Sequence, residues 1–571
     1  MPSDAPSAAP PAAAADAATT ASDPTAETAS DAPTWDRERL LHRLPTILLL
    51  GYVVVAFPVL LFGYGRYHWF FRDEWMFFTE RMAIEPASYF EPFNVHPAAG
   101  PVLVYQVLWN VFGIDSYRPY QAVVIALHLT AVVLLHRVMR RSGVRPWLAA
   151  AYAAVFVLYG PGDQNILWAF QVGFSGALVL GLTHLLLADH DGPLGRRDAV
   201  AVLAGIGAVM TAGVGPILVV VTAATVLLRR GWRAAAALSA PVAAVYLAWY
   251  LIEHADSSGP LGSPTTARLA EWIWWSVSGT FVGIGHHRIL AVVAAALAVG
   301  GLAWAWAAGL GRWRRGDHAA WRATRGRLAA PTSMLVGSVL WAATTGWGRW
   351  FTGFNGSRAD RYVHIATALA LPAVAVGAEQ VARRWRATVP VLVVLALIPL
   401  PPNADALRPE VFGRPYMEDR ERIITNAVRV PFAREVPRDV QPIADAYDGE
   451  LTIGWLLDAY DAGKLAVPDH PISPALENEL RVRLGLAQRS GDPRPTPCTD
   501  PDTEAGDLRL DRGDEIVIRG PVRVVYLDDG RPASRPVPFE TRDGTRLVAE
   551  LDGLTVRVTA PAPSAGYCAP S

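Results

Sequence analysis

Residues 44–64 read LPTILLLGYVVVAFPVLLFGY, a run without a charged side chain. Arg37, Arg39 and Arg43 come shortly before it. A run of about 20 apolar residues is long enough to cross a bilayer as a helix, and arginine collects on the cytoplasmic side of such helices. The pattern predicts a first membrane span, with the N-terminus in the cytoplasm and Tyr64 at the outer face.

The same pattern, an apolar run bounded by an arginine patch, repeats along the 571 residues. Keeping every arginine patch in the cytoplasm gives about eleven spans. They are Leu44–Tyr64, Tyr117–Met139, Trp147–Tyr159, Ile166–Leu187, Ala199–Thr211, Ile217–Leu228, Ala234–Ile252, Ile289–Leu310, Pro331–Thr345, Val363–Val381 and Val389–Leu400. Pro97–Ile114 is apolar but short, and a crossing there would place Arg140 and Arg141 outside, so we expect it to lie along the outer surface as an amphipathic helix.

Composition points to the same class of protein. The chain is 52% hydrophobic and 18% charged, whereas charged residues make up about a quarter of a soluble domain. Its formal net charge is -1, which does not fit the basic face of a nucleic-acid-binding protein. Composition therefore excludes a soluble enzyme and argues against a nucleic-acid partner.

The chain divides into three predicted parts. Residues 1–34, mostly Ala, Pro, Ser, Thr and Asp, predict a disordered cytoplasmic tail. Residues 35–401 predict an all-α polytopic membrane domain with a first outer loop at 65–115 and a second outer segment at Glu253–Arg288. Residues 402–571 predict a small extracytoplasmic C-terminal domain.

The C-terminal domain is expected to be an α+β or β-sandwich fold. Alternating apolar residues predict strands at Glu515–Arg519, Val522–Leu527, Arg546–Leu551 and Leu554–Thr559. The chain has two cysteines, Cys498 and Cys568, both after the last apolar run. On the oxidising side of a membrane they predict one disulfide across the β part.

The first outer loop opens with Trp69-Phe70-Phe71-Arg72-Asp73-Glu74-Trp75. Carboxylates among aromatic rings at a membrane surface lose solvent, which raises the pKa and makes a better base. Neighbouring residues on a helix point about 100° apart, so Asp73 or Glu74 faces a site, not both. The alternative is that Arg72 merely neutralises one of them.

A histidine follows in Phe93-Asn94-Val95-His96-Pro97. His96 is expected either to occupy the turn before a helix that begins near Pro97 or to hydrogen-bond a phosphate or sugar hydroxyl. The sequence leaves both interpretations open.

A late outer loop contains Arg349, Arg358 and Arg361 with a single acid, Asp360. Arginine is scarce outside, and an unpaired charge at the start of a span is costly. The partner is either Asp360 with the acids of the first loop, or a lipid phosphate that matches the guanidinium fork.

Other polar residues near the outer face are assigned to packing. Trp168, Gln171 and Ser175 share one helical stripe and are expected to form interhelical hydrogen bonds. His128 and His184, inside spans, are expected to be packed and hydrogen-bonded. No phosphate-binding glycine loop is evident.

Taken together, these residues resemble the GT-C superfamily of membrane glycosyltransferases. The resemblance covers about residues 44–400 and rests on four features in chain order. They are one N-terminal span, an outer loop with Asp73-Glu74, His96-Pro97 before an interfacial helix, and a late outer Arg361-Tyr362. The family's His-Pro-Pro-Leu reads His96-Pro97-Ala98-Ala99 here.

The resemblance implies transfer of a sugar from a polyprenyl-phosphate donor to a cell-envelope glycan, lipid or protein acceptor at the outer face of the cell membrane. It implies Asp73 as catalytic base, with Glu74 as second choice, and His96, Arg361 and Tyr362 at the lipid phosphate. We expect Arg349 or Arg358, from the same late loop, to assist Arg361 there. Metal use varies within the superfamily, so no metal ligand or cofactor is assigned and a divalent metal stays open.

Two alternative functions involve no catalysed reaction. A transporter or lipid flippase would carry charges and broken helices at mid-membrane depth, whereas the acids and arginines here gather at one face. A non-catalytic anchor for the C-terminal domain would leave the acidic first loop and Arg361 without a role.

Overall fold

A computed structural model describes residues 37–253, 262–407, 413–443, 451–489, 504–539, 545–561 and 565–568. The chain divides into two compact units, residues 1–44 and 45–571, and everything below belongs to the second, apart from the start of the first helix. The predicted disordered tail, residues 1–34, lies outside the described residues.

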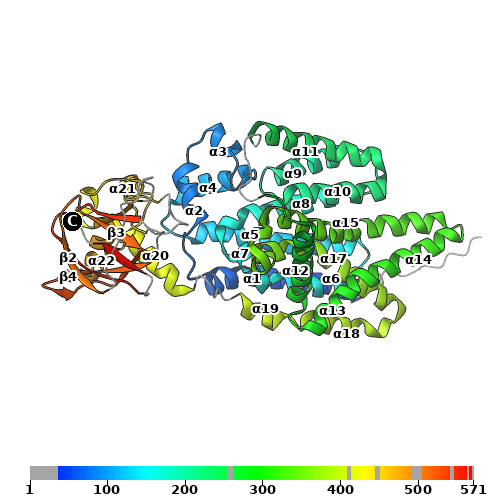
Figure 1. The fold of residues 1–571 in the computed structure, drawn as a ribbon. Coiled ribbons are helices and arrows are strands. Elements are labelled where there is room, and N and C mark those ends of the chain that lie inside the picture. Colours follow the sequence, from blue (N-terminus) through cyan, green and yellow to red (C-terminus); the bar gives the residue numbers. More distant parts are fainter. Residues whose placement is uncertain are drawn as a thin grey trace, which may run out of the picture. The chain divides into compact units, whose positions relative to one another are not determined.

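Helices dominate the first two thirds of the chain (Figure 1). They are α1 (Arg37–Pro58), α2 (Asp73–Glu80), α3 (Pro86–Phe90), α4 (Ala99–Phe112), α5 (Arg118–Arg141), α6 (Pro146–Val157), α7 (Asp163–Leu167), α8 (Val172–Ala188), α9 (Arg196–Val209), α10 (Gly215–Arg230), α11 (Trp232–Glu253), α12 (Thr266–Gly285), α13 (Arg288–Ala296), α14 (Leu302–Arg314), α15 (His318–Arg349), α16 (Gly353–Ser357), α17 (Asp360–Arg384), α18 (Val389–Leu397) and α19 (Leu400–Ala406).

Several of these helices identify a multi-pass membrane protein. Among the described residues, eight helical stretches are long and apolar enough to cross a bilayer: Arg43–Tyr64, Arg118–Arg141, Ala169–Ala188, Trp232–Glu253, Arg288–Arg314, His318–Ser357, Asp360–Arg384 and Arg386–Ala406. Each overlaps one of the eleven predicted spans. The polytopic helical fold is confirmed, with fewer long spans than expected.

Three predicted spans are too short for a free crossing, and the reason is local. α6 has 12 residues, from Pro146 to the Gly160-Pro161-Gly162 turn that follows it closely. α9 has 14 residues and α10 has 16, joined by a turn at Thr211–Val214. A free crossing needs about 20 residues, so these helices depend on their packed neighbours.

The segment predicted to lie outside at Glu253–Arg288 contains a helix that the sequence pattern did not predict. α12 has 20 residues, with Thr265 as its N-cap. It packs against α13, α15 and α17, and Trp272 on it is fully buried. It is outside the eight candidate spans, and the charged pair Arg268–Glu271 lies in its first turns.

α17 is the central helix of the membrane part. It packs against α15, α12, α14 and α6, and nearly all of its side chains are buried. Small residues allow this packing, because a Cβ on Gly377 would collide with the backbone of the neighbouring π-turn at Leu297–Gly301. The N-terminal end of α17 carries Arg361.

The first outer segment contains α2, α3 and α4. As predicted, the stretch after His96 forms a short helix with two different faces. α4 buries Val102 and Tyr105 on one face and exposes Val107 and Val111 on the other. Such an exposed apolar face suits a helix that lies along a membrane surface.

The described residues of the C-terminal region form three α-helices and nine strands. These are α20 (Arg414–Ala427), α21 (Ile453–Asp461), α22 (Pro474–Gly485), β1 (Leu486–Arg489), β2 (Gly506–Leu510), β3 (Glu515–Arg519), β4 (Val522–Asp528), β5 (Arg531–Pro532), β6 (Val537–Phe539), β7 (Thr545–Ala549), β8 (Leu554–Thr559) and β9 (Gly566–Cys568). All four predicted strands are present.

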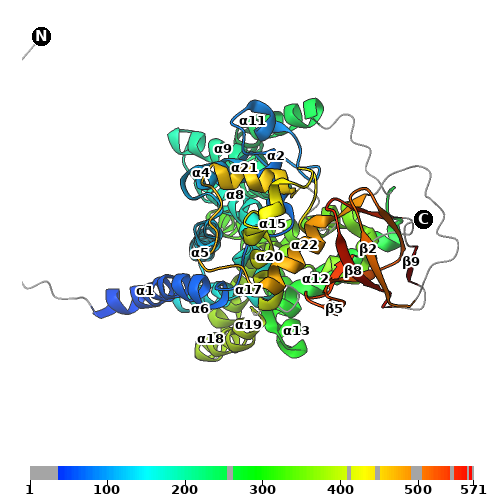
Figure 2. The ribbon, with the colours of Figure 1, turned by 90° about the vertical axis from the view of Figure 1, so that its left-hand side faces the viewer.

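The strands form two small antiparallel sheets, one in the order β1-β7-β3-β9 and one in the order β2-β8-β4-β5, with β6 paired to β4. Buried side chains of both sheets, among them Ile516, Val524, Leu547 and Val556, share one hydrophobic core. α22 packs against β4, β1 and β8 (Figures 1 and 2). The predicted α+β or sandwich class is confirmed.

The predicted disulfide remains a prediction. Cys568 is the last residue of β9, and Cys498 lies outside the described residues.

Lys464 joins the C-terminal region to α4. Its ammonium group donates hydrogen bonds to the carbonyl oxygens of Trp109 (3.3 Å) and Asn110 (2.9 Å) in the last turn of α4. The N–H of Ile114 donates to the Lys464 carbonyl oxygen at 2.7 Å. Gly113, at φ 54°, has no room for a Cβ against that carbonyl. A cation at the negative end of a helix is stabilising, so this contact fixes the two segments together.

Candidate active site

A cavity of about 410 Å³ lies where residues 72–101, the start of α8, the α9–α10 turn, the C-terminal end of α15 and the N-terminal end of α17 meet. Its charged and polar walls include Arg72, Asp73, His96, Gln171, Arg349 and Arg361, and its aromatic walls include Phe93, Trp168, Phe170, Phe174, Trp341 and Tyr362. Five of the seven predicted site residues therefore line one space: Asp73, His96, Arg349, Arg361 and Tyr362.

Asp73 is the first residue of α2 and lines the cavity. Burial raises the pKa of its carboxyl group above the usual value. The positive charges of Arg361, Arg72 and Arg349, in decreasing order of effect, act in the opposite direction. Asp73 is thus a partly desolvated carboxylate that faces cations.

Glu74, the next residue, points elsewhere and is fully buried. The Tyr105 hydroxyl donates to its Oε1 at 2.6 Å, and the Phe71 N–H donates to its Oε2 at 3.0 Å. Burial raises the pKa of Glu74 to about 8, although these hydrogen bonds lower it. At neutral pH its protonated form therefore predominates.

The aromatic cluster around Glu74 explains its burial. Phe70 makes edge contacts with Phe78, Tyr117 and Tyr120 at ring-centre distances of 4.9 to 5.2 Å. The same core continues into α20, α21 and α22 of the C-terminal region. These rings hold α2 rigidly and so fix where Asp73 stands.

Arg361 is positioned by α7. Its Nη1 donates to Gln164 Oε1 at 3.1 Å, and its carbonyl oxygen accepts from Asn165 Nδ2 at 2.9 Å. The guanidinium carbon lies 5.0 Å from the ring centre of Tyr362. Beside it, burial and the charge of Asp360 raise the pKa of Asp163.

A one-directional hydrogen-bond chain runs from Asn165 into the membrane part. Asn165 Nδ2 contacts His364 Nδ1 (3.2 Å), His364 Nε2 contacts His128 Nδ1 (3.1 Å), and His128 Nε2 contacts the Val157 carbonyl oxygen (3.1 Å). A carbonyl oxygen only accepts, so His128 carries its proton on Nε2 and His364 on Nε2. Both histidines are then neutral and satisfied, which agrees with the prediction that His128 is a packed residue.

His184 agrees with its prediction as well, because its Nδ1 lies 2.6 Å from the Ala201 carbonyl oxygen. In the predicted polar stripe, Ser175 donates to the Asn165 carbonyl oxygen at 2.8 Å. Trp168 and Gln171, in contrast, line the cavity.

His96 closes a two-residue turn. The N–H of Phe93 donates to the His96 carbonyl oxygen at 2.9 Å, and the reverse bond measures 3.0 Å. The two central residues, Asn94 and Val95, have φ values of 48° and 66°, as in type I′ turns. Gly213 gives the His96 ring its space, because a Cβ there would lie 2.7 Å from that ring.

Backbone strain concentrates at this cavity. Arg72, Asn94 and Val95 line it and are three of the five non-glycine residues with positive φ in the described chain. Such conformations cost roughly 1–3 kcal/mol each and are typical of functional sites. Arg72 was predicted only as a possible neutralising partner, and its place on the wall depends on this unusual backbone.

Arg358 does not line the cavity. Its Nη2 donates to Ser278 Oγ at 3.2 Å, and its guanidinium carbon lies 4.5 Å from the ring centre of Phe354. The cavity therefore faces three arginines, Arg72, Arg349 and Arg361, and one carboxylate, Asp73. Among the described residues, no three His, Cys, Asp or Glu side chains are grouped closely enough to hold a metal ion.

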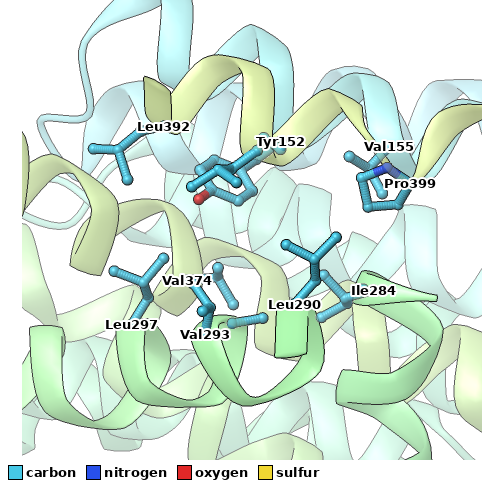
Figure 3. Close-up of a pocket in the computed structure, with 13 residues that line it drawn as sticks. Tyr152, Val155, Ile284, Leu290, Val293, Leu297, Val374, Leu392 and Pro399 are labelled. Carbon is cyan, nitrogen blue, oxygen red and sulfur yellow. The ribbon is translucent and has the colours of Figure 1, made fainter. Parts of the chain in front are cut away.

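A second, apolar cavity of about 30 Å³ lies between α6, α12, α13, α17 and α18. Figure 3 shows Leu290, Val293 and Leu297 opposite Tyr152 and Leu392 across it. No charged side chain lines this space, so it offers no catalytic group.

Comparison with known proteins gives one distant match. No family model matches the chain, and no curated protein matches it. The chain is similar to the solved structure of an Archaeoglobus fulgidus oligosaccharyltransferase tethered to an acceptor peptide with an NVT sequon, at 14% identity and a TM-score of 0.39. The match covers 76% of this chain and 60% of that one.

Proposed function

We propose that the protein is a membrane glycosyltransferase of the GT-C type. It transfers a sugar from a polyprenyl-phosphate donor to a cell-envelope glycan, lipid or protein acceptor at the outer face of the membrane. The observation that carries this proposal is that Asp73 and Arg361, far apart in the chain, line one cavity together with Arg72 and Arg349.

The reaction needs a base, and Asp73 supplies it. Its carboxylate removes the proton from an acceptor hydroxyl while that oxygen attacks the anomeric carbon of the donor. The bond from that carbon to the phosphate oxygen breaks, and polyprenyl phosphate leaves with the bonding electrons. Attack opposite the leaving group inverts the anomeric centre. A positioned base contributes roughly 10²–10⁴ in rate.

The cavity charge suits the leaving group. Arg72, Arg349 and Arg361 carry three positive charges against one negative charge on Asp73, and a leaving phosphate gains negative charge as the bond breaks. Guanidinium groups bind phosphate through paired hydrogen bonds, and aromatic walls exclude water and strengthen this attraction. His96 and Tyr362 line the same cavity, and we assign them hydrogen bonds to the phosphate or the sugar.

Geometry favours Asp73 over Glu74 as the base. Glu74 is fully buried, accepts two hydrogen bonds within the protein, and has a pKa raised to about 8. Asp73 lines the cavity. Glu74 therefore has a positioning role, since it holds the start of α2 through the Phe71 N–H.

The proposal includes an orientation. The N-terminus and the arginine-rich helix ends lie in the cytoplasm, and the first outer segment, the cavity and residues 402–571 lie outside. The C-terminal region, which shares a hydrophobic core with the first outer segment, then stands beside the acceptor.

The test is sugar transfer from labelled polyprenyl-phosphate sugars by purified wild type, Asp73→Asn and the matched neighbour Glu74→Gln. Asp73→Asn should lose transfer by at least about a hundredfold while it still folds, and Glu74→Gln should retain most of it. Full turnover in a folded Asp73→Asn variant contradicts the proposal and leaves a transporter, a flippase or an anchor as the alternatives.

A further inference from the structure

A second concentration of arginines lies at the opposite ends of the helices that form the cavity. Arg349 lines the cavity, and Arg327 precedes it by 22 residues on α15, which corresponds to about 33 Å of helix. Arg361 and Arg383 are similarly placed on α17. A hydrocarbon core is about 30 Å thick, so Arg327 and Arg383 lie at the other membrane surface.

Three arginines, Arg140, Arg327 and Arg383, lie around the α5–α6 turn at Gly143. Arg312 acts electrostatically on Arg327, and we call these four residues the arginine cluster. Arg383 Nη2 donates to the Gly143 carbonyl oxygen at 2.9 Å. A Cβ on Gly143 would lie 2.5 Å from Cδ of Arg327. Arg140 donates to the Val144 carbonyl oxygen. Arg327 is under the positive charges of Arg383 and Arg312 and the single negative charge of Glu379, which also acts on Arg140.

Carboxylates do not balance this charge. Glu379, the acid beside the cluster, accepts from Arg145 Nε at 2.9 Å and from Arg383 Nε at 2.9 Å. Its side chain is 8% exposed, so both bonds are shielded from water. Within the part of the chain that the structure describes, Arg140, Arg312 and Arg327 have no carboxylate at ion-pair distance.

The other acids at these helix ends are also engaged, and Asp317, the N-cap of α15, accepts the N–H of Ala320 at 2.9 Å. Asp189 pairs with Arg141 and Arg229, Asp191 pairs with Arg229, and Asp198 pairs with Arg230. The protein therefore presents several unneutralised guanidinium groups at a membrane surface, where charges interact strongly.

Exposed tryptophans mark the depth of the cluster. Trp313, next to Arg312, is 46% exposed, and Trp385, two residues after Arg383, is 52% exposed. Trp385 also contacts Trp304 at a ring-centre distance of 6.2 Å. Tryptophan prefers the headgroup level of a bilayer, so the cluster lies at the depth of lipid phosphates.

We propose that the arginine cluster binds the phosphate of an anionic phospholipid headgroup. Guanidinium forks match phosphate oxygens, and basic pockets between helix ends are known to favour anionic lipids. This site lies one membrane thickness from the cavity and does not depend on the proposed transfer reaction.

The experiment measures thermal unfolding of the full chain in detergent micelles with three probes: phosphatidylglycerol, phosphatidylcholine with the same acyl chains, and inorganic phosphate. Phosphatidylglycerol should raise the unfolding midpoint saturably, and the other two should not. Arg312→Gln with Arg327→Gln should raise the phosphatidylglycerol concentration for half the effect by about tenfold.

Arg535→Gln is the matched control, because it removes one exposed arginine (71%) of the C-terminal region. If the double variant fails to fold, Arg312→Gln alone, at an exposed position, gives the same comparison. An unchanged phosphatidylglycerol response in the folded variant overturns the proposal. An equal response to phosphatidylcholine or to inorganic phosphate overturns it as well, and none of these readouts involves sugar transfer.

Discussion

Replacement of Glu74 by Gln should lower stability in acid and raise it in base. The pKa of Glu74 rises from 4.5 to about 8 on folding, chiefly because of burial. The folded state therefore holds a proton that the unfolded state has released between these two values. Stability from this proton is fully present below pH 4.5 and is lost as the pH rises through about 8.

The expected size follows from the two pKa values. A rise from 4.5 to about 8 corresponds to about 5 kcal/mol of stability lost across that range, at about 1.4 kcal/mol per pKa unit. Gln cannot ionise, so the variant escapes this loss. Its one amide oxygen can accept from Tyr105 or from the Phe71 N–H but not from both, which costs about 1 kcal/mol at any pH. The variant should be less stable by about 1 kcal/mol near pH 4.5 and more stable by about 4 kcal/mol near pH 9.

The assay is unfolding of both proteins by denaturant in micelles at intervals from about pH 4.5 to pH 9. The two curves of unfolding free energy against pH should cross, at about pH 5 to 6. If the curves of wild type and variant ran parallel, Glu74 would have the same pKa in the folded and the unfolded state. The account of a buried, protonated Glu74 carboxyl group would then be wrong.

Four further outcomes are expected. Arg361→Lys keeps the charge but loses the paired hydrogen bonds, so the KM for the lipid-linked donor should rise about tenfold or more, whereas Arg358→Gln should leave the KM nearly unchanged in the same kinetic assay. Gly213→Ala should push the His96 ring from its place, so kcat should fall while the unfolding midpoint moves little. The pKa of Asp73 is raised, so kcat/KM should rise with pH up to a value above that of an ordinary aspartate, and a flat profile for wild type would contradict its role as base.

The long spans were predictable because apolar length and arginine placement are properties of single segments. The prediction of spans was less complete where packing against neighbouring segments determines whether a helix is stable. α6, α9 and α10 were predicted close to their observed bounds, but with 12, 14 and 16 residues they fall short of the eight long apolar helices and depend on packed neighbours. No helix was predicted within Glu253–Arg288, where α12 has the charged residues Arg268 and Glu271 in its first turns and buries Trp272 against α15.

The candidate site shows the same division. Residue chemistry identified Asp73, His96 and Arg361, and the structure brings them to one cavity. Residue chemistry could not distinguish Arg349 from Arg358. A short 3-10 turn and α16 lie between them, so that Arg349 lines the cavity while Arg358 contacts Ser278. Nor could residue chemistry find Arg72 or Gln171, whose positions on the wall depend on backbone angles and distant packing.

Lys464 is the only lysine in the sequence, and its ammonium group is engaged with the last carbonyls of α4. Amine-reactive reagents thus have a single side-chain target, and acylation there requires that the ammonium group first release these carbonyl oxygens and lose a proton. The rate of labelling at this one position would report how often these hydrogen bonds open, without any engineered probe.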